Sequence, residues 1–586
     1  MKTPVSHRFR ASAAIVVLLV LLQVLPVLAQ RTRPATNSPD ELRRPRLVLL
    51  IAVDQFRYDY LERFGDLFGK NGFRRLLREG ASWAQANYDH TPTYTACGHA
   101  TMMTGAYPSE TGIIGNEWID RETGKRITSV SDASVKLLGG NANEPAASPR
   151  RLLASTVGDE LRLATNDRSK VIGISVKDRS AILPAGRHAN AAYWFSGTSG
   201  NMVSSTYYFN QLPNWVVQFN NKRPADKFFG AKWERLLPES EYLKRAGADS
   251  PLWENIGRVA GDTNSFPHTI TGGATTPGPQ FYNALDYSPF SNDLLVQFAE
   301  EALVNENLGQ DDDTDVLTLS FSANDYVGHR YGPYSQEVMD MALRVDHQIG
   351  TLLDFVDTKV GLRNAIVILT ADHGVAPIPE HAAALGLDGA RVQSDDILKA
   401  VRTALSARYN SKGQTPDPTA DYIYTYDAGG RSQPAFINGN LYFNYAALKR
   451  DGVDLDEIDR VAGEAALSVR GTARYFTRRQ LHDGAIPVTD PIERRVLHGF
   501  YSTRSGDVVI LAEPYKYLGD FIPATHGTPY AYDTHVPVII VALGLMPGKY
   551  YDKASPADIA PTISALLRTT PPSNSVGRIL IEAMRK

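Results

Sequence analysis

The sequence predicts an α/β protein with an open, mainly parallel central sheet. The first observation is the run Leu47–Val53 (LVLLIAV), which is apolar throughout, as expected of a strand buried on both faces. Similar runs recur at residues 171–176, 316–322, 365–371 and 537–543. The second observation is that helical patterns lie between these runs. Such alternation is typical of this fold class, whose ligands gather beyond the carboxyl ends of the strands.

The clearest helical pattern covers residues 335–356. Its apolar residues follow the i, i+3, i+4 spacing of one helix face: Val338, Met341, Ala342, Val345, Ile349, Leu352, Leu353 and Val356. Two stretches fit the alternation poorly, at approximately residues 181–311 and 378–517. The first is rich in aromatic residues, Asn, Gly and Ser, and the second mixes short strands with helices. We interpret both as insertions that form the rim of a site.

Residues 1–29 have the pattern of a secretory signal peptide. Three basic residues precede an apolar stretch at residues 11–29 that ends in a small-residue cleavage pattern. A retained membrane anchor is the alternative, although Gln23 and Pro26 interrupt the run. A polar, proline-bearing linker follows at residues 30–46. We therefore expect a bacterial protein that is periplasmic or secreted.

The composition is that of a folded, soluble protein, with 43% hydrophobic and 21% charged residues. Without residues 1–29 the chain keeps 58 basic against 64 acidic residues, a formal charge of about −6, so it is not a general nucleic-acid binder. Cys97 is the single cysteine and cannot form an intramolecular disulfide. An exported chain of this kind is held by its core, to which metal can add.

Carboxylates and imidazoles occur where the predicted strands end. The set is Asp54, Asp325, His329, Asp372, His373 and His526, and all but His526 lie on or just after a strand end. Taken singly, such an aspartate often caps a helix, and an isolated histidine is usually structural or exposed. Taken together they are more informative, because Asp325 and His329 are four residues apart and can face the same way on one helical turn.

This donor set favours two transition-metal ions. Three imidazoles with three carboxylates favour zinc, with manganese or iron as alternatives, over calcium, which prefers oxygen ligands. Six ligands suit two ions better than one. Two ions about 4 Å apart clamp the attacking and leaving oxygens of an in-line displacement at phosphorus.

Thr95 is a candidate nucleophile for such a displacement. It stands directly before a predicted helix at residues 96–103, so its ordinary role is an N-cap. The same position suits attack on phosphorus, because a metal ion stabilises an alkoxide and a helix N-terminus favours a bound phosphoryl group. Thr91 and Thr93 are local rivals that the residues alone do not exclude.

Cys97 is expected to be a small buried residue. A sulfatase-like role would require Cys-x-Pro-x-Arg, whereas His99 and Thr101 occupy the Pro and Arg positions here. Lys177 and Arg179 are separated by one residue after the strand at 171–176, so in extended geometry both would point to one face. Such a pair is ordinarily solvated. Beside two metals the pair would contact the oxygens of a dianionic phosphoryl group, and the Asn116 amide, ordinarily a turn residue, can donate to the same oxygens.

Seven motifs, in order along the chain, give the sequence a family resemblance. They are Asp54, YTACGHATMMTGAYP, GNEW, KDR, NDYVGH, TADHG and HGTPYAYDTHVP, with RSAILPAGRHANAAYWF and DIAPTISALL in support. From about residue 46 onward the chain resembles the bacterial alkaline phosphatases with a threonine nucleophile, the phosphate-irrepressible type of the alkaline phosphatase superfamily. The resemblance implies a three-layer α/β/α sandwich over residues 47–586.

The resemblance also implies a site. Asp325, His329 and His526 would hold one zinc ion, and Asp54, Asp372, His373 and the oxygen of Thr95 the other. Thr95 would be phosphorylated during turnover. Asn116, Lys177 and Arg179 would bind the phosphoryl oxygens in place of a magnesium site. His535 lies close to His526 in the sequence, and the HGT context selects His526.

We therefore expect an exported two-zinc alkaline phosphatase that releases inorganic phosphate from small-molecule phosphate monoesters through a phosphothreonine intermediate. We expect no nucleic-acid partner and no stable membrane insertion after signal removal; the sequence leaves the oligomeric state open, with a monomer favoured. The first alternative is a nucleotide pyrophosphatase/phosphodiesterase of the same superfamily, against which the basic pair Lys177 and Arg179 argues, since it matches a dianionic monoester. The second alternative is an inactive exported binding protein, against which the complete ligand set argues.

Overall fold

The computed structural model describes residues 1, 44–254, 261–411, 413–519 and 522–585. Residues 2–43, which hold nearly all of the predicted signal peptide and linker, lie outside the described residues. The described residues from Pro45 onward belong to one compact unit, which contains the central sheet. In the part of the chain that is described, no helix has both the length and the apolar character needed to span a membrane.

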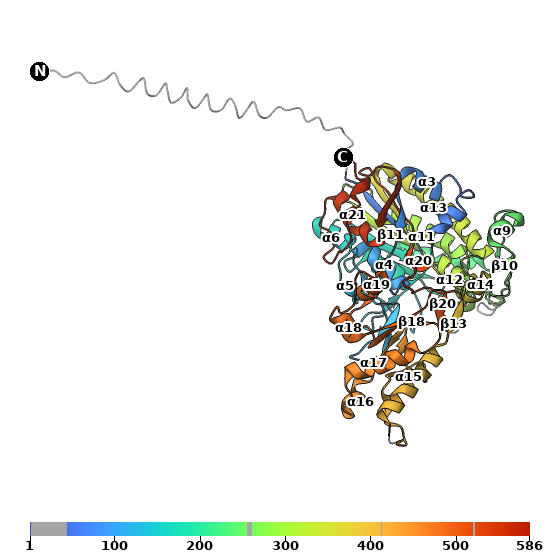
Figure 1. Cartoon of the computed structure of the whole chain (residues 1–586). Helices are drawn as coiled ribbons and strands as arrows, with labels where there is room; N and C mark the ends of the chain where they lie inside the picture. The colour runs from blue at the N-terminus through green and yellow to red at the C-terminus, as the bar shows by residue number, and fades with distance from the viewer. Residues whose placement is uncertain (2–43, 255–260, 412, 520–521, 586) are drawn as a thin grey trace. The chain divides into compact units, whose positions relative to one another are not determined.

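Within the described residues, ten strands form the central sheet (Figure 1). They are β1 (Leu47–Val53), β2 (Ala81–Ala86), β5 (Leu137–Leu138), β6 (Val171–Ser175), β7 (Ala191–Phe195), β8 (Met202–Ser205), β11 (Asp315–Phe321), β12 (Ala365–Thr370), β21 (Val538–Val541) and β22 (Gly548–Ala554). Their order in the sheet is β22-β2-β21-β12-β1-β11-β6-β7-β8-β5. The four neighbours β12, β1, β11 and β6 are parallel, whereas β21 and β8 run antiparallel to their neighbours. The predicted mainly parallel α/β fold is confirmed, and the five predicted strands differ by at most two residues at either end.

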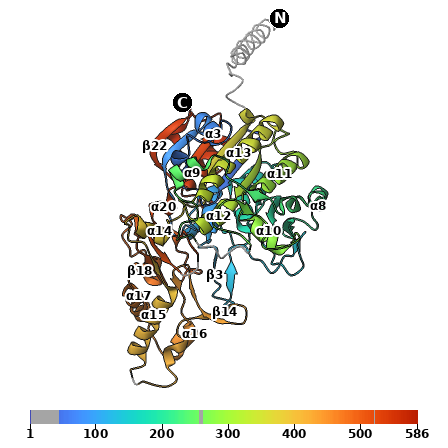
Figure 2. The same cartoon turned by 90° about the vertical axis from the view of Figure 1, so that its right-hand side faces the viewer.

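The alternating side chains of β1 explain why helices cover both faces of the sheet. Leu49 and Ile51 belong to one hydrophobic cluster with α11 (Phe290–Asn305) and α13 (Gln336–Lys359). Val48 and Leu50 belong to another cluster, which contains residues of α4 (Thr95–Thr104), α6 (Val157–Ala164) and α21 (Ile559–Leu567). Because successive side chains of a strand point to opposite faces, β1 is buried on both sides. The three-layer α/β/α arrangement follows, and α11 lies beside α13 in both views (Figures 1 and 2).

The two expected insertions are built differently. Residues 181–311 contribute β7 and β8 to the central sheet, and their helix α11 packs on its face. Residues 378–517, which we call the outer insertion, have a hydrophobic cluster of their own. The outer insertion contains helices that project away from the central sheet in Figures 1 and 2 and strands of a second sheet: α15 (Ser394–Tyr409), α16 (Tyr445–Arg450), α17 (Leu455–Leu467), β16 (Phe436–Ile437), β17 (Asn440–Leu441), β18 (Thr472–Thr477) and β19 (Val508–Ala512).

Candidate active site

The carboxyl ends of four neighbouring strands bring the predicted residues together. Asp54 directly follows β1, and Lys177 follows β6. Asp325 lies on α12 (Ala323–Tyr331), which follows β11, and Asp372 follows β12. Since these four strands are parallel neighbours, residues more than 300 positions apart in the sequence meet at one edge of the sheet.

Two groups of possible metal ligands lie at this edge. One contains Asp325, His329 and His526, the grouping that the family resemblance implied. The other contains Asp54, His373 and again Asp325. Within each group the ligand atoms lie within 4.8 Å of one another. Asp325 therefore serves both groups, a sharing that sequence analysis did not anticipate.

Asp372, which we predicted in the second group, points to the same place. Its Oδ2 lies 3.3 Å from Nε2 of His373, and its Oδ1 accepts hydrogen bonds from the main-chain N–H groups of Gln55 and His373. Asp372 Oδ2 and Asp54 Oδ1 are buried without a hydrogen-bond partner among the described residues. A buried carboxylate oxygen without a donor is costly, and a bound cation relieves that cost.

All three predicted imidazoles present Nε2 to this space. In each ring Nδ1 lies at hydrogen-bonding distance from a main-chain carbonyl, which can only accept, so Nδ1 carries the proton and Nε2 keeps the lone pair that a metal requires. Burial lowers the pKa of His373 to about 3 and also lowers that of His526, so both rings are neutral at pH 7. The distances are 2.7 Å from His329 to Ala524 O, 2.7 Å from His526 to Thr93 O and 2.9 Å from His373 to Gly374 O.

Lys177 balances part of the buried negative charge. Its Nζ lies 2.8 Å from Asp54 Oδ2 and 2.5 Å from Asp325 Oδ2. Burial opposes the ammonium form, but the two carboxylates raise the pKa of Lys177, so it is charged. Burial, together with repulsion from Asp372, raises the pKa of Asp54 well above its usual range. One ammonium does not offset burial and mutual repulsion for three carboxyl groups, and a bound cation would relieve both.

Arg179 lies in a helix rather than in the extended chain that we predicted. β6 ends at Ser175, Lys177 is the N-cap of α7 (Asp178–Ala185), and Arg179 lies in the first turn of α7. The prediction of strand-like alternation is wrong because the helix begins directly after Lys177. Nε of Arg179 is buried and has no hydrogen-bond partner among the described residues, so it can still donate to an anion.

The structure separates Thr95 from its two rivals. Thr95 is the first residue of α4 and Tyr94 is the N-cap, so Thr95 does not have the ordinary cap role that was the alternative to a nucleophile. Thr95 Oγ1 lies 3.4 Å from Nε2 of His373. The hydroxyls of Thr91 and Thr93 instead donate to main-chain carbonyls at residues 527 and 528, each at 3.0 Å. Thr95 is thus the one of these three whose hydroxyl faces the metal-ligand groups.

The remaining predicted residues have well-defined surroundings. Asn116 Oδ1 accepts from the main-chain N–H of Ala96 at 2.9 Å, which satisfies an otherwise free donor of α4 and leaves the amide nitrogen for an anion. Cys97 is fully buried, and burial raises the pKa of its thiol, as expected of a core residue. His535 lies elsewhere: its ring stacks on Tyr58 with centroids 4.5 Å apart.

Gln55 is a residue that sequence analysis missed. Its backbone is left-handed, with φ of 63°. Its main-chain N–H donates to Asp372 Oδ1 at 3.1 Å, and its side-chain Nε2 donates to Asp325 Oδ1 at 2.6 Å. Gly328, next to His329, leaves room for this amide, because a Cβ there would overlap Gln55 Oε1. The glycine inside NDYVGH was the available sequence signal of such a close approach.

His99 and Gly98 join α4 to the end of β12. Nδ1 of His99 lies 2.9 Å from Thr95 O and 3.2 Å from Asp372 Oδ2, and its Nε2 lies 2.8 Å from Ser320 Oγ. A Cβ at Gly98 would overlap the main-chain carbonyl of Asp372. These contacts fix the position of Thr95 relative to Asp372.

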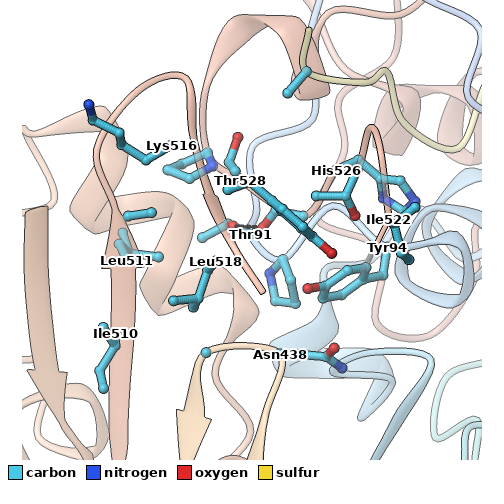
Figure 3. Close-up of a pocket in the computed structure, with 18 of the residues that line it drawn as sticks. Thr91, Tyr94, Asn438, Ile510, Leu511, Lys516, Leu518, Ile522, His526 and Thr528 are labelled. Carbon is cyan, nitrogen blue, oxygen red and sulfur yellow. Dashed lines mark hydrogen bonds between the residues drawn. The ribbon is translucent and has the colours of Figure 1, made fainter. Parts of the chain in front are cut away.

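A cavity of about 310 Å³ adjoins the site (Figure 3). His329, His526 and Asn116 line it at the end nearest the metal-ligand groups. Residues of β19 and of β20 (Lys516–Leu518) form much of its other wall.

Comparisons with known proteins agree with this architecture. The family described as type I phosphodiesterase / nucleotide pyrophosphatase matches residues 48–519. Alkaline phosphatase PhoV of Synechococcus elongatus is 36% identical over 551 residues, which cover 93% of this chain and 94% of that protein. Alkaline phosphatase PafA of Elizabethkingia meningoseptica is 35% identical over 573 residues, which cover 96% and 98%. The chain belongs to the PafA and PhoV type of bacterial alkaline phosphatases in this family.

The solved structures support the same assignment. The crystal structure of wild-type alkaline phosphatase PafA matches with a TM-score of 0.84 at 34% identity, covering 93% of this chain and 100% of that chain. The predicted family, the predicted fold and the predicted enzyme class are therefore confirmed.

Proposed function

We propose that this alkaline phosphatase is exported and hydrolyses phosphate monoesters with two zinc ions and a phosphothreonine intermediate on Thr95. The position of the Thr95 hydroxyl is the main observation that supports the proposal. It lies at the N-terminus of α4, 3.4 Å from an imidazole Nε2 that is deprotonated and beside buried carboxylate oxygens that lack donors.

The donor atoms fit two divalent ions. Asp325, His329 and His526 would hold one, and Asp54, Asp372, His373 and the oxygen of Thr95 would hold the other. Mixed nitrogen and oxygen ligands favour zinc over calcium or magnesium. When bound, the ions supply positive charge that stabilises the Thr95 alkoxide and the phosphoryl oxygens.

The side chains of the site have different roles in the two displacements at phosphorus. Thr95 Oγ1 gives up its proton and forms a bond to phosphorus while the bond from phosphorus to the ester oxygen breaks, and the ester oxygen takes up a proton and leaves as the alcohol. Water then attacks the phosphothreonine, inorganic phosphate leaves, and the Thr95 hydroxyl is restored. Lys177, Arg179 and the amide nitrogen of Asn116 bind the non-bridging oxygens, and the N–H groups at the start of α4 add to this attraction.

The sequence pattern of residues 1–29 supports export. A chain expressed with its full N-terminus should appear outside the cytoplasm and begin near residue 30. Fractionation followed by N-terminal sequencing tests this, and a full-length chain recovered from the membrane would support the anchor instead.

Replacement of Thr95 tests the mechanism directly. Thr95→Ala should abolish phosphoenzyme trapping in an acid-quenched reaction with labelled substrate, while the zinc content stays near that of the wild type because six other ligands remain. Thr93→Ala is the matched control. This variant should still be phosphorylated on Thr95, since the wild-type Thr93 hydroxyl donates to the main-chain carbonyl of Thr528 and does not face the metal ligands. Label found on Thr93 or Thr91 in the wild type would refute the assignment to Thr95.

A further inference from the structure

The cavity beside the active site lies between the strand ends and the outer insertion. In Figure 3, His526 and Tyr94 lie at one end, and Ile510 and Leu511 of β19 lie at the other. Its volume of about 310 Å³ falls at the lower end of the range of about 300–1,000 Å³ for small-molecule sites. The cavity is therefore large enough for an organic group of one or two rings.

The cavity contacts one side of the metal-ligand arrangement. His329 and His526 line it, whereas Thr95, Asp54 and His373 are not among its lining residues in the described chain. An in-line displacement requires the leaving oxygen to depart on the side opposite the attacking oxygen. The cavity thus lies where a leaving group would extend when Thr95 attacks.

Apolar and polar side chains both line the cavity, and among the described residues few of them carry charge. Among the described residues that line it, none has a carboxylate. The aliphatic part of Lys516 lines the cavity, but its Nζ lies 2.6 Å from Asp388 Oδ1 and points away from the cavity (Figure 3). The apolar and aromatic wall includes Tyr94, Phe436, Ile510, Tyr515, Tyr517 and Leu518.

Tyr94 joins this wall to the catalytic end. It directly precedes Thr95, and its ring meets that of His526 edge-on, with centroids 5.6 Å apart. Gly527 makes room for the ring: its φ is +117°, and a Cβ there would stand 2.7 Å from Tyr94 Cζ. The face of a tyrosine ring fixed in this way can stack on a planar group, and its negative face disfavours an anion.

We propose that this cavity is a leaving-group site that selects phosphate monoesters with an uncharged aromatic leaving group over those whose leaving group carries a carboxylate. The site rests on the proposed function, since it assumes that Thr95 attacks the phosphoryl group. An aromatic ring gains apolar contact with the wall, while an anionic ring loses hydration and meets no unpaired ammonium or guanidinium among the described side chains of the wall.

A charge introduced into the wall tests the site. Phenyl phosphate and 3-carboxyphenyl phosphate have leaving groups of similar basicity and differ mainly in charge. The wild type should prefer phenyl phosphate in kcat/KM. Leu518→Lys should raise the ratio of carboxyphenyl to phenyl kcat/KM roughly five-fold at low salt, and less at high salt, because the new ammonium pairs with the carboxylate. General damage to the fold would lower both values and would not produce this gain.

Two further variants complete the experiment. Leu467→Lys makes the same change at an exposed position of α17, outside the cavity, and should leave the ratio as in the wild type. Ser394→Lys places an ammonium on another part of the cavity lining, should also raise the ratio, and replaces Leu518→Lys if that variant does not fold.

The outcomes separate the leaving-group site from the proposed function. Competitive inhibition by inorganic phosphate measures the phosphoryl end alone. If phosphate inhibits and phosphoenzyme forms on Thr95, but neither lysine variant changes the ratio, the leaving-group site is wrong and the proposed function stands. If no phosphoenzyme forms on Thr95 in the wild type, both proposals fail.

Discussion

The central sandwich and the outer insertion differ in how they position residues around one site. Asp54, Asp325 and Asp372 follow strands of six or seven residues that are buried throughout and have a neighbouring strand on both sides. The cavity wall of the outer insertion comes from shorter strands and loops supported by a separate hydrophobic cluster. The difference suggests that phosphoryl chemistry depends on the rigid sheet, whereas preference for the leaving group depends on a part that can change independently.

The proposed difference between the central sandwich and the outer insertion would be contradicted most clearly if a metal ligand at a strand end could be replaced without loss of zinc or activity. Asp325 is a ligand of one ion in the proposed assignment and also lies within reach of the other group, so Asp325→Asn should reduce bound zinc to about one ion per chain or less and lower kcat/KM at least about a thousand-fold, or ~4 kcal/mol. Elemental analysis of the purified variant together with steady-state kinetics measures both. Asp346→Asn, a buried aspartate that holds main-chain N–H groups at Gly69 and Phe73, is the control and should keep its zinc. Full zinc and full activity in Asp325→Asn would contradict the shared role.

A second prediction separates charge recognition from leaving-group recognition. Lys177→Ala should lower monoester kcat/KM about a hundred-fold and diester kcat/KM much less, because a diester lacks the second negative charge that the ammonium binds. The two values are compared for a matched aryl monoester and its methyl diester. Equal losses for the two substrates would remove the charge argument and favour a general structural role for Lys177.

A third prediction concerns support of the ligands. Gln55→Ala should weaken zinc binding about 10- to 100-fold, since it removes the side-chain donor that holds Asp325. Competition with a chelator measures the affinity independently of turnover. Gln348→Ala is the control because this buried glutamine donates to Pro289 O and Asp293 Oδ1 instead. An unchanged zinc affinity in Gln55→Ala would show that Asp325 is held without Gln55.

The smallest effect on catalysis is expected at His268, which contributes to stability. Burial acts against the charged ring, but hydrogen bonds with Asp262 and Glu337 raise the pKa of His268 from 6.5 to about 9. Its stabilisation, on the order of 3 kcal/mol, is thus fully present below about pH 6.5 and is lost as the pH rises through about 9. Unfolding by denaturant at pH 6 and pH 10 should show a large difference between wild type and His268→Gln only at pH 6. A constant difference at both pH values would contradict the ionic role.

Long, continuous patterns in the sequence predicted the fold well. The runs that form β1 and β12 are apolar throughout because both faces of those strands are buried, so their ends, and with them Asp54 and Asp372, were visible in the sequence. The helical position of Arg179 was not visible, because a spacing of two residues is compatible with a strand as well as with a helix start. Nor was the role of Gln55, whose contacts depend on a left-handed backbone and on a glycine more than 270 positions away.

The contact between Gly98 and Asp372 restricts how this site can be transplanted. The backbone of α4 rests directly on a main-chain carbonyl at the end of β12, with no side chain between them. A protein engineer who grafted only the ligands and the threonine onto another scaffold would therefore reproduce the chemical groups without the spacing between helix and strand. A successful graft must carry both backbones together, as a single cassette.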